Sequence, residues 1–429
     1  MREMLNRKIL RFFTRAIIKK YNPEIVGIAG SVGKTSTKEM ALEILRSNFR
    51  VRGSEKNICL KIGLPLAIIG VSDPGSSCLG WLKVWGRALR IIFCHQPDYP
   101  EILVLEMGAA KRGDMEYLTD LVNCDIAVVT ASQPVHLDSF KTTKKMIQEE
   151  RQLISSLGKT AWAILNHDEG EVISMSKKTA ADILTYGFHP QASVRASDVK
   201  TKLDREGRWP EGMMFKISYE GSLVPIYIPG VIGEHVVYPA LAAITVGLAL
   251  GLNLVDISAS LKDFKWPNGR MRLLAGIKNT LLIDDSYNAS PGPMRAALRA
   301  LSGILLADSQ TKKYAVIGDM AELGQQTVAS HREVGLRVVE AGVDYLITVG
   351  EAMKIAAQAA REAGLPEDQI YSFSLAAEAG RFLQERLKTG DVVLIKGSRI
   401  MHMEKIVKEV MAEPLILAEI ASNQIDKRE

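Results

Sequence analysis

Short apolar runs alternate with amphipathic stretches along most of the chain. Residues 24–29 form an apolar run that predicts a strand, and residues 37–47 have the spacing of a helix. Strands that alternate with helices predict a parallel sheet covered on both faces, so the fold class is α/β. The same alternation predicts strands at 102–105, 126–130 and 161–165, and helices at 114–121 and 143–156.

Residues 190–229 interrupt this rhythm. The strand-like runs 214–218 and 223–228 predict a small antiparallel insertion. Trp-Pro-Asn-Gly-Arg at 266–270 is a plausible boundary, after which the alternation restarts as a second α/β domain. Its expected elements are strands at 280–283, 314–317, 345–349 and 392–395 and helices at 292–301 and 331–341. We expect four parts: a basic amphipathic helix over 1–22, a central domain over 23–269, a C-terminal Rossmann-like domain over 270–415, and a tail over 416–429.

The basic character of the chain is concentrated at its N-terminus. Residues 1–20 hold seven of the 54 basic residues and one of the 49 acidic ones, so the remaining 409 residues carry 47 basic against 48 acidic residues. A nearly neutral body argues against a nucleic-acid-coating surface. We therefore expect no nucleic-acid partner.

The N-terminal segment has two interpretations. Leu5, Ile9, Phe12, Phe13 and Ile17 follow helical spacing with basic residues between them. The helix either packs on the body and exposes its charges, or contacts a membrane surface. It lacks the continuous apolar region and cleavage site of a signal peptide. The segment 79–93 mixes tryptophans with basic residues and has the same two interpretations.

Composition excludes several classes of protein. Of the 429 residues, 47% are hydrophobic and 24% charged, which excludes a disordered chain and a small disulfide scaffold. The four cysteines show no CxxC pair, so reduced thiols in a cytoplasmic protein are expected. The uncharged stretch 236–255 contains Pro239 and many small residues, which favours a buried core helix over a membrane span.

A phosphate-binding loop is the most specific signal in the sequence. Residues 30–36, here called the phosphate loop, follow the first expected strand and precede the first expected helix. Glycines let backbone N–H groups close around phosphate oxygens, and the helix N-terminus favours an anion. Lys34 adds positive charge and Thr35 offers a hydroxyl to Mg²⁺, although Ile28 replaces the first glycine of the strict Walker pattern. The predicted phosphate-binding residues are Gly30, Ser31, Gly33, Lys34, Thr35 and Ser36.

The run 27–40 resembles the ATP-binding loop of the Mur ligases, and most closely that of the MurF-type branch, which adds D-alanyl-D-alanine in peptidoglycan synthesis. Further stretches agree in order, and the resemblance spans residues 24–410. It implies a cytoplasmic, monomeric, ATP- and Mg²⁺-dependent ligase that forms an amide bond through an acyl phosphate. The matching stretches are 106–109, 128–130 with 136–140, 284–291, 318–324 with His331, and 396–399.

The resemblance also implies roles for individual residues. Lys34 would act on the phosphates, Thr35 and Glu106 would hold a first Mg²⁺, and His136 would lie near a second metal. The linker and the C-terminal domain would contact the nucleotide, which implies that domain closure assembles the site. The nucleotide contacts expected there are Arg270, Asp285 and Asn288, and the expected substrate contacts are Asn57, Lys396, Ser398 and Arg399.

The residue fourteen positions after His136 departs from the family pattern. Mur ligases that amidate peptides usually carry a carbamylated lysine there, whereas this chain has Glu150 preceded by Glu149. A carbamate and a carboxylate are both planar anionic oxygen donors, which hard cations accept. Our hypothesis is that Glu150 replaces the carbamate as a catalytic metal ligand, with Glu149 as the alternative.

Three further departures bear on substrate recognition. Only 23 residues precede the first strand, whereas MurF-type enzymes usually carry a uridine-binding domain there. Asn57 is retained from an asparagine-rich substrate segment, but Cys59 and its neighbours replace the other polar positions. Val236 and Pro239 replace two asparagines that lie near the adenine in the family. We expect the phosphate chemistry to be retained and recognition to have changed.

The leading interpretation is addition of D-alanyl-D-alanine to a UDP-N-acetylmuramoyl-tripeptide. A variant uses a lipid-linked muropeptide, with the protein cytoplasmic but peripheral at the inner face of the membrane through residues 1–20. The sequence also leaves open a folylpolyglutamate- or cyanophycin-type ligase and a non-catalytic nucleotide-binding partner. Retention of Lys34, Thr35, Glu106 and His136 argues against the non-catalytic partner.

Overall fold

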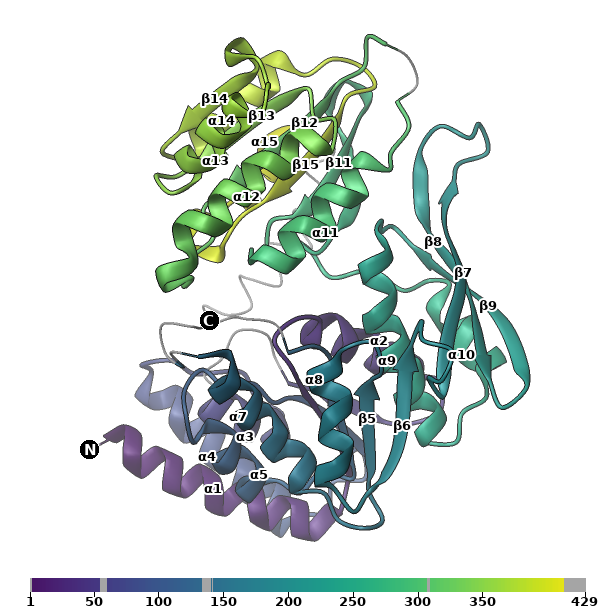
Figure 1. Cartoon of the computed structure of the whole chain (residues 1–429). Helices are drawn as coiled ribbons and strands as arrows, with labels where there is room; N and C mark the ends of the chain where they lie inside the picture. Colours follow the sequence, from purple (N-terminus) through teal and green to yellow (C-terminus); the bar gives the residue numbers. More distant parts are fainter. Residues whose placement is uncertain (1, 55–59, 133–139, 141, 307–308, 413–429) are drawn as a thin grey trace.

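The computed structural model describes residues 2–54, 60–132, 140, 142–306 and 309–412. Two sheets, each covered by helices, form two parts that lie one above the other (Figure 1). A chain of this length exceeds the size of one typical hydrophobic core, so division into two α/β units is physically expected. The predicted α/β fold class is confirmed.

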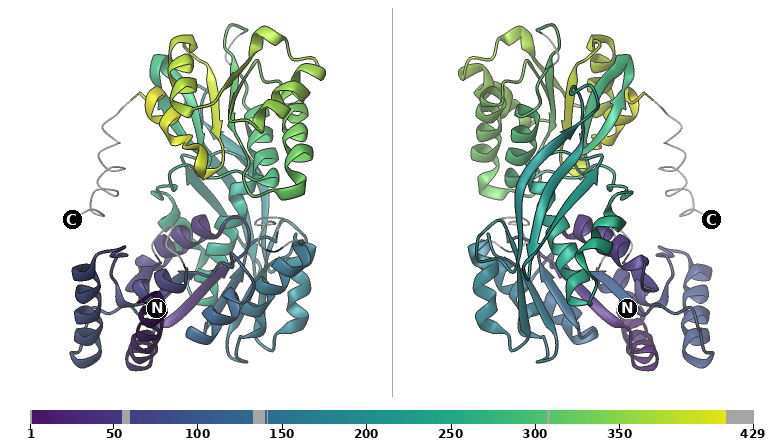
Figure 2. Two further views of the ribbon diagram at one scale, coloured as in Figure 1. Left: turned by 90° about the vertical axis from the view of Figure 1, so that its left-hand side faces the viewer. Right: turned by 90° about the vertical axis from the view of Figure 1, so that its right-hand side faces the viewer.

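The first sheet has nine strands in the order β2-β3-β1-β4-β5-β6-β7-β8-β9. Along this order, every pair of neighbouring strands from β2 to β7 is parallel. Strand β8 is antiparallel to both of its neighbours, β7 and β9. The antiparallel strands therefore extend the parallel sheet rather than forming a separate insertion, as Figure 2 also shows. The strands are β1 (Glu24–Ala29), β2 (Val51–Gly53), β3 (Ile102–Glu106), β4 (Ile126–Val129), β5 (Trp162–Asn166), β6 (Asp182–Gly187), β7 (Val194–Leu203), β8 (Pro210–Tyr219) and β9 (Ser222–Pro229).

Successive side chains along a strand point to opposite faces of the sheet, so each face has its own hydrophobic core. Val26 and Ile28 of β1 belong to the core under α2, α9 and α10, whereas Ile25 and Ala29 belong to the core on the opposite face. Helix α9 belongs to the uncharged stretch 236–255, for which the sequence predicted a buried core helix. It is apolar on all sides. The helices of the first face are α2 (Lys34–Arg46), α9 (Val237–Ala249) and α10 (Leu254–Leu261), and those of the other are α1 (Arg2–Tyr21), α3 (Leu60–Ile69), α4 (Cys78–Phe93), α5 (Asp114–Leu121), α7 (Thr143–Ser155) and α8 (Gly170–Ile173).

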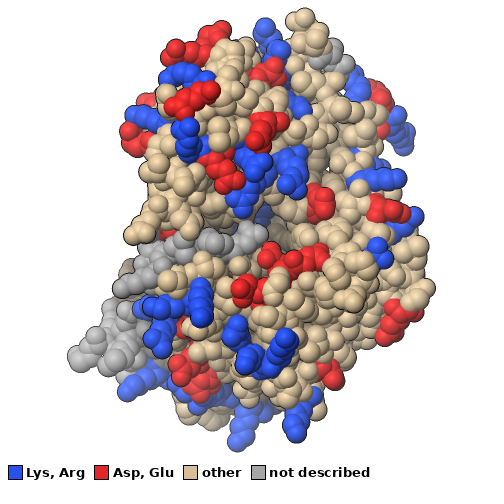
Figure 3. All heavy atoms as spheres, viewed as in Figure 1, with Lys and Arg blue, Asp and Glu red and all other residues tan. Residues whose placement is uncertain are grey.

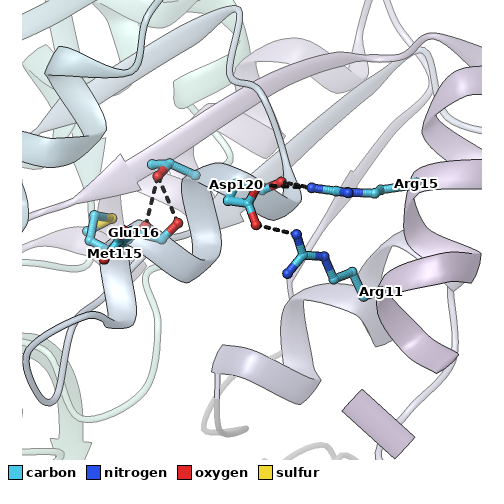
Figure 4. A network of polar contacts seen from close by, with 6 residues as sticks. Arg11, Arg15, Met115, Glu116 and Asp120 are labelled. Carbon is cyan, nitrogen blue, oxygen red and sulfur yellow. Dashed lines mark hydrogen bonds and ion pairs between the residues drawn. The ribbon is translucent and has the colours of Figure 1, made fainter. Parts of the chain in front are cut away.

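Helix α1 packs on the body with its apolar face inward. Leu10, Phe13 and Ile17 are buried. Arg11 and Arg15 both donate to the carboxylate of Asp120 in α5, the latter at 3.0 Å, and this fixes the helix from its charged side (Figure 4). The structure thus favours the first of the two interpretations of this helix. No helix in the described part of the chain is long and apolar enough to cross a membrane.

The second sheet has six strands in the order β10-β11-β15-β12-β13-β14, with only β10 antiparallel to its neighbour. The strands are β10 (Arg272–Gly276), β11 (Thr280–Asp285), β12 (Lys313–Gly318), β13 (Tyr345–Val349), β14 (Ile370–Phe373) and β15 (Val392–Lys396). Helices α11 (Pro291–Ser302), α12 (Thr327–Glu340) and α13 (Met353–Glu362) cover one face, and α14 (Ala376–Arg386) and α15 (Glu404–Val410) the other.

The order of the central strands determines where a ligand-binding site is expected. Strand β1 lies between β3 and β4, so the connections that leave β1 and β3 run in opposite directions across the sheet. Such a reversal opens a crevice outside the carboxyl ends of the strands, where α/β proteins bind ligands. The surface is hollowed between the two domains, with basic side chains gathered on its upper side (Figure 3).

Candidate active site

The phosphate loop has the backbone conformation that its glycines allow. Gly30 and Gly33 have φ values of 123° and 90°, which disfavour other residues. A Cβ atom on Gly30 would lie 2.2 Å from Thr130 Oγ1, so the segment that directly follows β4 packs against the loop. Ser31 fastens the loop to the segment after β4 by donating from its backbone N and its Oγ to the Ala131 carbonyl, at 2.7 and 2.8 Å. The loop is therefore held open at the N-terminus of α2.

Lys34 lies over this loop with its ammonium group bonded to the Gly30 carbonyl. Burial lowers the pKa of the ammonium, while the negative charges of Glu106 and Glu150 act against that shift. Both acids therefore lie near the phosphate loop, although they come from β3 and α7. This arrangement places the Lys34 ammonium, bonded to the Gly30 carbonyl, near two carboxylates.

Thr35 and Glu106 form a pair suited to a hard cation. The Thr35 hydroxyl donates to Glu106 Oε2 at 3.3 Å, and Glu106 Oε1 is buried with no hydrogen-bond partner among the described residues. Lys38 Nζ lies 3.4 Å from Oε1 and is itself bonded to the Ser54 carbonyl. Mg²⁺ usually takes one or two protein oxygens together with phosphate oxygens and water, so this pair fits a nucleotide-bound Mg²⁺. Lys38 was missed by sequence reasoning, although it lies one helical turn after Lys34.

Arg270 connects the second domain to this pair. Its Nη2 donates to Thr35 Oγ1 at 3.1 Å, and its guanidinium lies 4.2 Å from the centre of the Tyr287 ring. Arg399 lies 5.8 Å from the centre of the same ring. Arg270 and Arg399, two of the predicted site residues, therefore both lie against the ring of Tyr287 beside the phosphate loop. Tyr287 itself was not among the predicted site residues.

The two glutamates of α7 have different surroundings. Glu150 accepts a hydrogen bond from the Ser132 hydroxyl and is 5% exposed. Burial raises the pKa of Glu150 to about 7, against the lowering effects of Ser132 and Lys34. Glu149 instead accepts from the backbone N–H groups of Gly113 and Met115 at 2.9 and 3.3 Å, at the start of α5. Glu150 faces the phosphate loop, whereas Glu149 stabilises a helix N-terminus.

Lys396 and Asp285 form a buried ion pair in the C-terminal domain. Lys396 is 1% exposed, and its Nζ lies 2.6 Å from Asp285 Oδ2 and 2.9 Å from the Asn288 carbonyl. The other carboxylate oxygen of Asp285 accepts from the Met271 backbone N–H at 3.2 Å, next to Arg270. This geometry favours a positioning role for Lys396 over the predicted contact with substrate, because its ammonium already has two partners.

Other motif residues organise the loops of the second domain. The Ser398 Oγ accepts from the Ala321 backbone N–H at 2.8 Å, and Asp319 accepts from Met353 at 2.7 Å at the start of α13. Buried His331 accepts from the Met320 N–H through Nε2. The predicted residues His136 and Asn57 lie outside the described residues. Among the residues that are described, no three His, Cys, Asp or Glu side chains cluster as a metal site.

A group of aromatic rings lies at the start of α9, where the two asparagines of the family pattern are replaced. Tyr238 donates to Asp168 Oδ2 at 3.0 Å and packs edge-on against Phe188, with ring centres 5.1 Å apart. His167 and His189 stack with ring centres 4.4 Å apart. The absence of asparagine at 236 and 239 signalled a change here, but only the structure shows that β5, β6 and α9 bring these rings together.

A phosphate loop, an acid at the end of the adjacent strand and an arginine from a second Rossmann-like domain define a two-domain nucleotide-using α/β enzyme. The chain belongs to the Mur ligase family. The family model of the Mur ligase middle domain matches residues 28–247, and that of the Mur ligase glutamate ligase domain matches residues 269–399. The resemblance seen in the sequence is thereby confirmed.

Curated relatives match most of the chain. The UDP-N-acetylmuramoyl-tripeptide--D-alanyl-D-alanine ligase of Bacillus subtilis is 27% identical over 406 residues, which cover 95% of this chain and 80% of that protein. The enzyme of the same name from Escherichia coli K12 is 27% identical over 384 residues, or 90% and 76% of the two chains. The two proteins therefore share both domains with this chain.

Solved structures show the same fold. The MurF ligase of Thermotoga maritima, determined in complex with ADP, matches with a TM-score of 0.73 and 23% identity over 94% of this chain and 83% of that one. A MurF structure from Acinetobacter baumannii matches with a TM-score of 0.76 and 24% identity, over 95% and 81% of the two chains. The fold of the chain is thus that of known Mur ligases.

Proposed function

We propose that this protein is an ATP-dependent ligase that joins D-alanyl-D-alanine to the terminal carboxylate of a UDP-N-acetylmuramoyl-tripeptide. The proposal is supported by family membership, by the names of relatives that match nine-tenths of the chain, and by the site itself. The observation that carries it is the series of contacts from Arg270 through Thr35 to Glu106, which joins both domains at the phosphate loop.

The reaction needs two displacements. A carboxylate oxygen of the acceptor attacks the γ-phosphorus of ATP, the bond to the β-γ bridging oxygen breaks, and ADP leaves. The amine then attacks the acyl carbon of the acyl phosphate, loses a proton, and displaces inorganic phosphate. Because neither step needs a protein nucleophile, positioning and neutralisation of charge are the main tasks of the protein.

The described residues include groups that would perform both tasks. The phosphate loop would bind the β- and γ-phosphates through backbone N–H groups, and Lys34 would neutralise charge on the transferred phosphoryl group. Thr35 and Glu106 would hold Mg²⁺, which supplies further neutralisation when bound. Glu150 would support a second cation in place of a carbamylated lysine, because its buried carboxylate faces Lys34 from α7.

Arg270 gives the domain arrangement a role in catalysis. The residue lies at the junction of the two domains and reaches the first turn of α2. Movement of the second domain would carry Arg270, Asp285 and Arg399 together, because β11 pairs with β15 and the backbone N–H of Met271, next to Arg270, donates to Asp285. The site is thus complete only when the domains are close, which protects an acyl phosphate from water.

An oxygen-transfer experiment tests this function. The acceptor is prepared with ¹⁸O in its terminal carboxylate and incubated with Mg-ATP and D-alanyl-D-alanine. Mass spectrometry should find one ¹⁸O in the released phosphate and the new amide in the peptide. Phosphate without ¹⁸O would exclude the acyl phosphate, and ATP consumption without peptide product would exclude the ligase.

A lipid-linked muropeptide is the second candidate acceptor, with the enzyme peripheral at the inner face of the membrane. It is favoured by the basic N-terminal helix and by the exposed apolar side chains of the neighbouring α4. The apolar face of α1 is buried, so α1 would contribute charge rather than insertion. Replacing the soluble acceptor with its lipid-linked form in the same reaction distinguishes the two acceptors.

A further inference from the structure

Helix α4 presents a row of apolar side chains to solvent. Leu79, Leu82, Leu89 and Phe93 are 73%, 67%, 44% and 80% exposed. Together with Gly86 they recur at intervals of three and four residues, which places them along one side of the helix. The row, here called the α4 stripe, is about 21 Å long at the rise of an α-helix. Clustered exposure of this kind marks an interaction surface.

The stripe is not needed to hold α4 on the body. The opposite side of the helix buries Trp81, Val84, Ala88 and Ile91. The Trp81 Nε1 donates to the Gly75 carbonyl at 3.1 Å, which fixes the start of the helix. Helix α4 lies beside α1 at the outer side of the central domain (Figure 2), and the residues that it buries lie on the side opposite the stripe.

The charged side chains of α4 itself all have one sign. Lys83, Arg87 and Arg90 are exposed, and residues 78–93 include no acidic side chain. Within the described part of the chain, no acidic residue forms an ion pair with any of the three. The adjacent α1 adds exposed Lys8 and Lys19 and a 67% exposed Phe12. Exposed apolar side chains beside a row of cations, on a helix without acidic residues, match an anionic lipid surface.

We propose that α4 docks the protein on an anionic membrane, with the α4 stripe in the headgroup region and Lys83, Arg87 and Arg90 against lipid phosphates. A second copy of the chain fits less well, because it would bring the same three cations against themselves. Docking would concentrate the enzyme at the surface where a lipid-linked acceptor lies. The inference concerns binding alone and stands whichever acceptor is used.

Vesicle co-sedimentation tests the proposal. Full-length protein is centrifuged with vesicles of equal parts phosphatidylglycerol and phosphatidylcholine, and with vesicles of phosphatidylcholine alone. One variant carries Leu79→Ser, Leu82→Ser, Leu89→Ser and Phe93→Ser, and a second carries Lys83→Glu, Arg87→Glu and Arg90→Glu. Leu223→Ser with Leu375→Ser is the matched control, since these leucines are 59% and 61% exposed outside α4.

The proposal predicts binding to the anionic vesicles that weakens with salt. The charge variant should bind at least about a hundredfold more weakly, because each basic residue near such a surface contributes roughly a fivefold factor and each introduced glutamate is repelled by it. The serine variant should also lose binding, while the control binds like the wild type. Equal binding by all proteins, or no binding by the wild type, overturns the proposal. So does a concentration-dependent dimer that both α4 variants abolish.

Two readouts separate this proposal from the proposed function. Ligation of a soluble acceptor should be unchanged in both α4 variants, and their thermal unfolding should match that of the wild type. Wild-type binding to anionic vesicles without any ligase activity would leave the docking proposal standing and reject the function. Full activity without vesicle binding would do the reverse.

Discussion

Arg270 donates a hydrogen bond to the hydroxyl of Thr35 across the junction of the two domains, over 3.1 Å. The same hydroxyl donates to Glu106, so one threonine connects the second domain with the carboxylate expected to hold Mg²⁺. The contact makes the geometry of the phosphate loop sensitive to the position of the C-terminal domain. Arg270 is therefore the residue through which domain position and catalysis should be coupled.

Replacement of Arg270 tests that coupling. Arg270→Ala should lower kcat/KM by about a hundredfold, since a preorganised cationic donor contributes on the order of 3 kcal/mol. Arg270→Lys keeps the charge but loses the planar stacking on Tyr287, and should lower it about tenfold. Steady-state kinetics with varied ATP measures both. Arg295→Ala removes a surface pair with Glu333 and serves as the control. Wild-type kinetics in Arg270→Ala would contradict the coupling.

Replacement of Glu149 and of Glu150, the two glutamates of α7, should have different effects. Glu150→Gln should lower turnover at least about a hundredfold and raise the Mg²⁺ concentration needed for half-maximal rate, because a buried anionic ligand is lost. Glu149→Gln should keep the Mg²⁺ dependence but lower the free energy of unfolding by about 1 kcal/mol, since it weakens the start of α5. Magnesium titrations and urea unfolding measure the two effects. Near-normal turnover of Glu150→Gln would exclude the metal role.

The predicted independence from CO₂ follows from the same residue. A carboxylate needs no carbamylation, so activity should be the same in bicarbonate-free and bicarbonate-supplemented buffer. The comparison is made by assaying phosphate release after prolonged degassing at constant pH. Stimulation by bicarbonate would indicate a carbamylated lysine elsewhere and would contradict the assignment of Glu150.

The ion pair between Lys396 and Asp285 should be structural. Lys396→Met leaves a buried carboxylate without its partner, which should lower the free energy of unfolding by about 3–5 kcal/mol. The double variant with Asp285→Asn should recover part of that loss. Urea unfolding of the two single variants and the double variant gives the coupling energy. A loss below about 1 kcal/mol in Lys396→Met would favour the direct substrate contact that the sequence suggested.

His235 should contribute a loss of stability in mild acid, whereas Glu150, whose pKa is raised to about 7 by burial, contributes in the opposite direction. Burial lowers the pKa of His235 from 6.5 to about 4, outweighing the opposite effect of Asp285. The unfolded chain takes up a proton as the pH falls below 6.5, whereas the folded protein does so only near pH 4. The stabilising contribution is thus fully present above pH 6.5 and is lost as the pH falls toward 4. Urea unfolding between these pH values should show a smaller loss in His235→Asn than in the wild type, and identical slopes would reject this explanation.

The strand–loop–helix conformation around residues 30–36 could be predicted from the sequence because it is local. Gly30, Gly33, Lys34 and Thr35 lie within six residues, so strand–loop–helix context was enough to place them. Most regular strands were also predicted, because burial on both faces makes them continuous apolar runs. The runs that became β8 and β9 were predicted, and β7 was not named. Their continuation of the main sheet depends on the pairing of Tyr186 with Val194, a contact that composition does not encode.

Contacts between distant residues explain what the sequence could not predict. Lys396 has the pattern of a substrate-steering cation, and only the packing of β11 against β15 shows its ammonium bonded to Asp285. Similarly, the choice between Glu149 and Glu150 required knowing which side of α7 faces Ser132 and which faces α5. Burial and partnership of a side chain are tertiary properties, so residue type and spacing could not decide between these roles.

Release of phosphate from Mg-ATP, with D-alanyl-D-alanine and UDP-N-acetylmuramoyl-tripeptide present and each omitted in turn, tests the central claim most directly. The account predicts release that requires both substrates and equals the amount of peptide product formed. It also predicts that Lys34→Ala abolishes this release, because the charge over the phosphate loop is lost. Release that is independent of either substrate, or ATP binding without any stimulated release, would contradict the assignment of this chain as the D-alanyl-D-alanine-adding ligase.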